Sequence, residues 1–279
     1  MTGVEHFAHG LTTPVLAYVV SVLGSLGGLL ATSQARTGGR ASTGWLALGA
    51  LCIGTAGIWA MHFIAMLSFT IPGAPIRYDV GLTLASGLLA VGVVGAGLAL
   101  AVHWQNLTGL CAGGVVTGLG VAAMHYLGMA SMRVDAHVSH DVRHIVAAVL
   151  IAVVAATLAL WFALRLRSGW ALLGASLLMG AAVSSMHYTG MFGMSAHVPQ
   201  DGAATPHGAE GLDFFLPLFI GLSVLLLFTI TLCLIARSED SVNPSVDPDE
   251  STRNQAPPTA PTPPQGRASV WQASTHPRE

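Results

Sequence analysis

The strongest constraint on this chain is a series of apolar stretches, each long enough to cross a lipid bilayer. A spanning helix needs about 20 apolar residues at a rise of 1.5 Å each. Seven such stretches lie between polar, proline-containing or arginine-containing segments, at residues 14–32, 45–69, 80–102, 107–132, 145–164, 170–194 and 214–235. Only 9% of the residues are charged, against about 25% in ordinary soluble domains. The sequence therefore predicts an all-α, polytopic membrane protein with seven transmembrane helices.

Three segments follow from this pattern. Residues 1–13 form a short N-terminus, residues 14–236 the membrane domain, and residues 237–279 a tail rich in proline and poor in large apolar side chains. Such a tail buries too little surface to offset its chain entropy, so we expect disorder. Arginines favour the cytoplasmic side of a membrane, and their distribution predicts an extracytoplasmic N-terminus and a cytoplasmic tail in a multi-pass protein of the cell membrane.

Three nine-residue segments repeat along the chain without gaps. They occupy residues 61–69, 124–132 and 186–194, and each begins with Met-His. Their histidines, His62, His125 and His187, are 63 and 62 residues apart. This distance equals one pair of helices, so the seven helices contain three helix-pair repeats. The three motif helices are the even-numbered ones and therefore run in the same direction, which places the three imidazoles at a similar depth.

Methionines surround each histidine at fixed spacing. Residues four apart share one face of a helix, and this places a thioether one turn beyond each imidazole. The methionines one residue before and four residues after the histidines are Met61, Met66, Met124, Met129, Met186 and Met191. Further along the same predicted helices lie Met132 and Met194, and next to the histidines lie Tyr126 and Tyr188, which we expect to support the ligands rather than to bind.

This combination of ligands predicts a metal site. Thioether sulfur suits copper(I) and imidazole suits copper, zinc and iron, so the pair favours copper, with haem iron as the alternative. Methionine in an apolar helix is more often ordinary packing, and a buried histidine is often structural. Ionisable groups inside a membrane are costly, however, and mark functional sites. Three in register favour a metal centre.

The motifs resemble those of the MHYT domain, a bacterial integral membrane sensor module. Residues 186–189 read Met-His-Tyr-Thr unaltered, the other copies read Met-His-Phe-Ile and Met-His-Tyr-Leu, and Gly-Ile-Trp precedes the first. The resemblance covers most of residues 14–236. It implies a signalling protein that holds copper through these Met and His residues and detects a diatomic gas such as oxygen, carbon monoxide or nitric oxide.

Many members of that family carry cyclic di-GMP synthase or hydrolase domains, or kinases, whereas here a proline-rich tail follows the helices. We therefore expect no enzymatic activity and an unidentified cytoplasmic or membrane signalling partner. A net charge of −2 gives no basic surface for nucleic acid. The alternatives are a copper-handling membrane protein, a haem-binding membrane protein and a purely structural protein.

A second group of histidines gathers between the helices on the predicted outer side. It comprises His137, His140 and His144 with Asp135 and Asp141, together with His6, His9, His197 and His207. These side chains predict either a second, exposed metal site or an ordinary solvated loop, and the sequence does not choose between them.

Overall fold

The computed structural model describes residues 4–8, 10–36, 42–199 and 203–242, with side chains up to residue 236. The chain divides into two compact units, Met1–Ser238 and Glu239–Glu279, and the description below concerns the first. Residues 237–242 of the predicted tail continue helix α8, whereas the rest of the tail, residues 243–279, and His9 lie outside the described residues.

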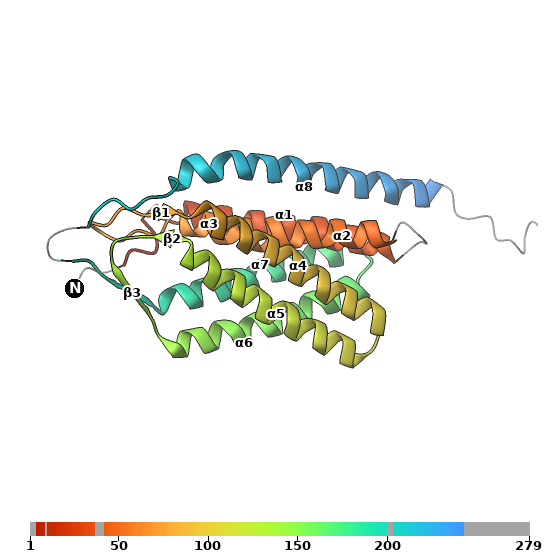
Figure 1. Cartoon of the computed structure of the whole chain (residues 1–279). Coiled ribbons are helices and arrows are strands. Elements are labelled where there is room, and N and C mark those ends of the chain that lie inside the picture. The colour runs from red at the N-terminus through yellow and green to blue at the C-terminus, as the bar shows by residue number, and fades with distance from the viewer. Residues whose placement is uncertain (1–3, 9, 37–41, 200–202, 243–279) are drawn as a thin grey trace, which may run out of the picture. The chain divides into compact units, whose positions relative to one another are not determined.

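The prediction of seven spanning helices is confirmed: within the described ranges, seven helices are long and apolar enough to cross a membrane (Figure 1). The second span, Ser42–Met66, consists of three consecutive segments, α2 (Ser42–Cys52), the π-helix η1 (Ile53–Ala60) and α3 (Met61–Met66). The other spans are α1 (Thr12–Ala35), α4 (Val80–Trp104), α5 (Leu107–Ala130), α6 (Val142–Arg165), α7 (Gly169–Phe192) and α8 (Gly211–Val242).

The motif helices end earlier than predicted. The ends predicted at residues 69, 132 and 194 lie two or three residues too far along the chain, because α3, α5 and α7 stop at Met66, Ala130 and Phe192. Met132 and Met194 consequently do not continue the helical face of the histidines, as the sequence had suggested. They begin two short strands instead, and there they remain buried.

Four short strands join the ends of the motif helices. The first pair is β1 (Arg77–Tyr78) with β2 (Met132–Arg133), and the second is β3 (His137–His140) with β4 (Met194–His197), both antiparallel. Their ladders take up the backbone hydrogen bonds that longer helices would have made. We call this end of the bundle the ribbon end (Figure 1).

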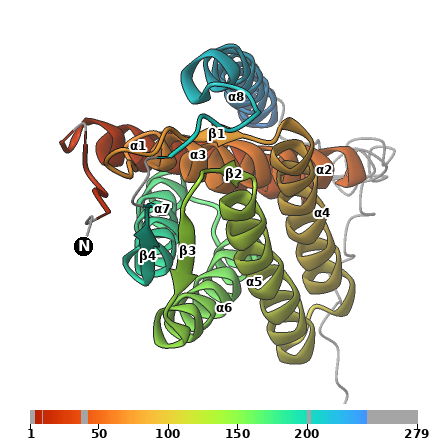
Figure 2. The same ribbon diagram turned by 60° about the vertical axis from the view of Figure 1, so that its left-hand side comes forward.

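The first six spans form a closed ring. Around the ring, α1 contacts the second span, followed in order by α4, α5, α6 and α7, and α7 contacts α1 again (Figure 2). Helix α8 packs on the outside of this ring, where Phe215 stacks on Phe63 at 4.7 Å between ring centroids and Leu226 packs against Cys52. The second span is the most deeply buried, with 78% of its central window inside the protein.

Glycines set the close approach of each motif helix to the helix beside it. A Cβ atom at Gly54 would lie 2.7 Å from the Cα of Val91 on α4. One at Gly118 would lie 2.4 Å from the Cα of Val153 on α6. Gly118 lies seven residues before the histidine of its helix, but Gly54 lies eight residues before His62. The π-helix η1 accommodates the additional residue, since a π turn holds one residue more than an α turn.

Candidate metal centre

The three motif histidines meet in the centre of the ring. His62 comes from α3, His125 from α5 and His187 from α7, and each is at most 1% exposed. Their ring centroids are 4.9, 4.9 and 5.2 Å apart, and their planes are nearly perpendicular to one another. The similar depth predicted from the repeat spacing thus brings the three imidazoles into direct contact.

The same nitrogen atom of each imidazole points inward. The Nδ1 atom of His62 lies 3.0 Å from Nδ1 of His187 and 3.1 Å from Nδ1 of His125. Metal–imidazole bonds of about 2.0 Å would separate three such nitrogens by about 3.3 to 3.5 Å in tetrahedral or trigonal geometry. An expansion of these two separations by a few tenths of an ångström would match this geometry, and the potential ligand atoms of all three histidines lie within 4.8 Å of one another.

The outer nitrogens of two rings face glycines on the next motif helix. A Cβ atom at Gly128 would lie 2.5 Å from Nε2 of His62, and one at Gly190 would lie 2.4 Å from Nε2 of His125. Neither Nε2 atom has a hydrogen-bond partner among the described residues. Each of these glycines lies three residues after its own motif histidine, a position whose role the sequence analysis missed.

Charge is scarce around the centre. The three motif spans contain neither Asp nor Glu, and among the described residues the three histidines alone form a compact group of potential metal ligands. An ion bound here would bring its charge into a low-dielectric interior with no carboxylate to compensate it. The desolvation cost rises with the square of the charge, so the site favours a monovalent ion over a divalent one.

The six methionines predicted beside the histidines are all buried. Met66, Met129 and Met191, one turn towards the ribbon end, are 1%, 5% and 2% exposed. They belong to the same apolar cluster as Met124 and Met186, whereas Met61 packs with Ala17 and Ile64 in a smaller one. The prediction that these thioethers bind metal remains a prediction.

The two motif tyrosines lie against the histidines. The ring of Tyr126 is 4.9 Å from that of His125, and the ring of Tyr188 is 5.0 Å from that of His187. Both hydroxyl groups are buried and have no hydrogen-bond partner in the described part of the chain. The tyrosine rings therefore lie beside the centre, and the prediction that they support the metal ligands remains a prediction.

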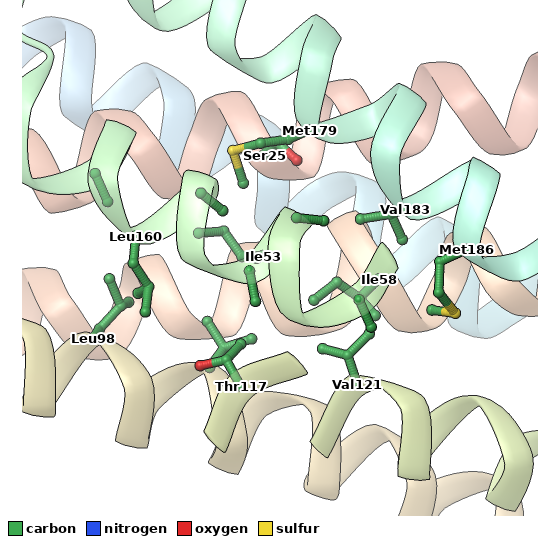
Figure 3. A pocket seen from close by; sticks show the side chains of 16 residues that line it. Ser25, Ile53, Ile58, Leu98, Thr117, Val121, Leu160, Met179, Val183 and Met186 are labelled. Atoms are coloured by element: carbon green, nitrogen blue, oxygen red, sulfur yellow. The ribbon is translucent and has the colours of Figure 1, made fainter. Parts of the chain in front are cut away.

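An apolar cavity of about 50 Å³ lies inside the ring (Figure 3). Ile58, Val121 and Val183 line it, and each of them precedes a motif histidine by four residues, which is one helical turn. The cavity therefore comes within about one helical turn of the triad. Elsewhere the lining is almost wholly aliphatic, with Ala156 and Leu160 of α6 on one wall. No local sequence pattern marks this cavity, because its walls come from six different helices.

The second histidine group is spread over the ribbon end. His137 pairs with His197 across the β3–β4 ribbon, and His140 pairs with Met194. His144 lies 3.3 Å from Asp141, while His6 packs between Phe69 and Phe192. Within the described residues these histidines do not converge on one point as the triad does.

Comparison with known proteins identifies the repeat. Residues 56–114 and 118–176 match the family model MHYT, described as a bacterial signalling protein N-terminal repeat. These two matches contain the first two motifs, and the third, with the unaltered tetrapeptide, lies beyond them.

Several bacterial signalling proteins are similar to this chain. The bifunctional diguanylate cyclase/cyclic di-GMP phosphodiesterase MucR of Pseudomonas aeruginosa is 40% identical over 207 residues, which are 71% of this chain and 28% of that protein. The cyclic di-GMP phosphodiesterase NbdA of the same organism is 39% identical over 58% of this chain and 21% of its own length. The signaling protein YkoW of Bacillus subtilis is 29% identical over 67% and 24%. This chain thus spans about a quarter of these relatives. No solved structure matches it.

Proposed function

Because this chain belongs to the MHYT family of multi-pass bacterial membrane proteins, we propose that it is a membrane sensor whose metal ion is held by His62, His125 and His187. The metal is copper, most favourably copper(I), and the sensed ligand is a small neutral molecule such as a diatomic gas. The observation that carries this proposal is that Nδ1 of His62 lies 3.0 Å from Nδ1 of His187 and 3.1 Å from Nδ1 of His125 at the centre of the ring.

The surroundings of the triad support copper(I). Three imidazoles with thioethers one turn away are soft to intermediate donors, which suit copper(I) and suit calcium or magnesium poorly. The absence of carboxylates from the motif spans favours the lower charge. The compactness of the triad supports a bare ion over haem, because imidazole nitrogens 3.0 Å apart leave no room for a porphyrin between them.

The cavity supports a small neutral ligand. Cavities lined by aliphatic side chains stay free of water and take up small apolar molecules. Here such a space of about 50 Å³ lies one helical turn below the triad. A ligand held there approaches the metal from the side opposite Met66, Met129 and Met191, so these thioethers and the ligand would compete for the same ion.

The placement of the three histidines on three different helices suggests how the protein would signal. Each histidine belongs to a different motif helix, so a change in coordination alters the spacing of three helices at once. The relatives named as cyclic di-GMP enzymes suggest that the output is read by a second-messenger enzyme.

The test is metal analysis of the detergent-purified chain after loading with copper(I). We expect about one tightly bound copper per chain, and the variant H62A/H125A/H187A should lose this tight binding. A second variant, H187N, keeps an amide near the position of Nδ1 and guards against loss of folding, which is monitored by thermal unfolding. A folded native protein that takes up no copper, or a folded H187N protein that binds it with unchanged affinity, contradicts the proposal.

A further inference from the structure

The triad is sealed, so an ion must travel to reach it. The three histidines are at most 1% exposed. The two ends of the bundle differ in the exposed side chains that could bind an ion on its way to the triad. Away from the ribbon end, the nearest exposed thiol on a motif helix is Cys111, fourteen residues before His125, or about 21 Å along the helix axis. At the ribbon end, exposed imidazoles lie next to the motif helices.

One of these imidazoles has a sulfur atom as its direct cross-strand neighbour. His140 of β3 is paired with Met194 of β4, and side chains of such a pair project from the same face, with Cβ atoms about 5 Å apart. His140 is exposed, whereas Met194 is only 4% exposed. The pair therefore places one potential metal ligand, the imidazole of His140, at the surface and another, the thioether of Met194, in the interior. Figure 2 shows β4 at the end of α7.

Methionine sulfur continues inward from this pair. Met194 lies three residues beyond Met191, and Met191 lies four residues beyond His187 on the same helix. The interval from His187 to Met191 is about one helical turn, or about 5 to 6 Å, and Met194, two residues beyond the end of the helix, belongs to the same buried cluster as Met191. On the other side, the ring of His140 is 6.1 Å from that of Tyr126, which in turn contacts His125. No other exposed histidine at the ribbon end, within the described residues, is paired with a buried methionine.

We propose that His140 and Met194 form an outer loading site for a soft metal ion, which then passes by way of Met191 to the triad of His62, His125 and His187. The proposal rests on the metal centre proposed above. It assigns a role to Met194 that is separate from binding at the triad, and it explains why an imidazole on a surface strand faces a thioether. The arginine distribution predicts that this end faces away from the cytoplasm.

The chemistry of the pair selects the ion. Imidazole and thioether together suit copper(I) and silver(I). Partial burial lowers the pKa of His140 below its usual value, which keeps the ring neutral and able to coordinate at neutral pH. The carboxylate of the adjacent Asp141 is engaged with Arg143 N–H and His144.

The experiment measures how fast copper(I) enters the full chain from a chromophoric chelator, followed by stopped-flow absorbance, together with the final copper content. In the variant H140A/M194L we expect the same final content as in the native protein, reached at least about tenfold more slowly. This factor is the lower end of the affinity lost when even an outer partner of a metal ligand is removed. The matched control is H137A/H197A, which removes the histidine pair from the same ribbon.

The outcomes separate this proposal from that of the metal centre. Loading of H140A/M194L at the native rate, or equal slowing in H137A/H197A, overturns the loading site. The variant H62A/H125A/H187A should retain one weaker copper(I) site that disappears when His140 is also replaced by Ala. If it retains none while the native protein binds copper, the loading site is overturned and the centre stands. If it binds as much as the native protein, the centre fails and the outer pair stands as an independent site.

Discussion

The Nε2 atom of His125 lies 2.4 Å from the point that a Cβ atom would occupy at Gly190 of the next motif helix. The same relationship joins His62 to Gly128, at 2.5 Å. Real side-chain carbons do not approach so closely, so glycine at these two positions is what allows the imidazoles to turn their Nδ1 atoms inward. The glycines position the ligands without touching the ion.

Replacing Gly190 by Ala should therefore displace the His125 ring. We expect the affinity for copper(I) to fall by about tenfold or more, the range reported for residues that orient metal ligands. G128A should act in the same way through His62. Competition with a copper(I) chelator measures both affinities.

The control is G174A on the same helix as Gly190, because nothing lies within 4 Å of a Cβ atom at Gly174. Alanine has a higher helix propensity than glycine, by up to about 1 kcal/mol, so this variant should bind copper normally and unfold no more easily. Unchanged copper affinity in G190A would show that the lack of a side chain at position 190 does not set the position of His125.

The cavity below the triad should bind xenon. Its lining is almost wholly aliphatic, and dry apolar cavities accept this atom. The variant A156L fills the cavity from α6 and should abolish the xenon-dependent shift in a ¹²⁹Xe magnetic resonance experiment, with the copper content unchanged. A181L adds the same side chain at an exposed position of α7 and should leave xenon binding intact. Equal loss in both variants would argue against the cavity as the binding place.

The start of α4 should depend on pH through Asp79. Its carboxylate accepts a hydrogen bond from the backbone N–H of Leu82 and another from Arg133 at 2.7 Å. The Arg133 hydrogen bond, followed by that of Leu82, lowers the pKa of Asp79. A lowered carboxyl pKa means that the stabilisation is complete above the unfolded value of about 3.9 and is lost as the pH falls through the folded value.

Nuclear magnetic resonance titration of labelled Asp79 should accordingly give a midpoint below 3.9, the value expected for an unperturbed aspartate. In R133Q, the midpoint should rise towards that value, since the largest cause of the shift is removed. A native midpoint at or above it would contradict the paired geometry.

The N-terminal segment should loosen in mild acid. Burial between Phe69 and Phe192 lowers the pKa of His6. A histidine whose folded pKa is depressed contributes stability that is complete above the unfolded pKa of about 6.5 and declines as the pH falls below it. The reciprocal backbone hydrogen bonds between Glu5 and Thr70 report on this docking.

Hydrogen exchange, corrected for the intrinsic pH dependence of the rate, should show the protection of the Thr70 amide falling between pH 7 and pH 5, the range in which histidine gains its proton. The variant H6Q cannot be protonated in this range and should show constant protection. A parallel decline in H6Q would assign the effect to another group.

The seven spans and the histidine triad were predictable from the sequence for a simple reason. In lipid, the backbone hydrogen bonds of a stretch of about 20 apolar residues can be satisfied within that stretch only by a helix. The repeat spacing then fixed His62, His125 and His187 at one depth. Both inferences depend only on helical geometry, which is local.

The helix ends and the strands were not predictable in this way. Met132 and Met194 fit the helical periodicity of their motifs, yet they lie in β2 and β4, because pairing with β1 and β3 competes successfully for their backbone hydrogen bonds. These partners are distant in the sequence, so no local pattern records the competition.

By itself the sequence determined which segments of this protein are long and apolar enough to span a membrane and which three imidazoles share a layer, since both follow from hydrophobicity and from a period of 3.6 residues. Only the tertiary structure decided which nitrogen points inward, which glycines face the rings of His62 and His125, where the cavity lies and that His140 faces Met194. Those relationships depend on the order of helices around the ring and on strand register, both of which are set by packing between segments that are far apart in the chain.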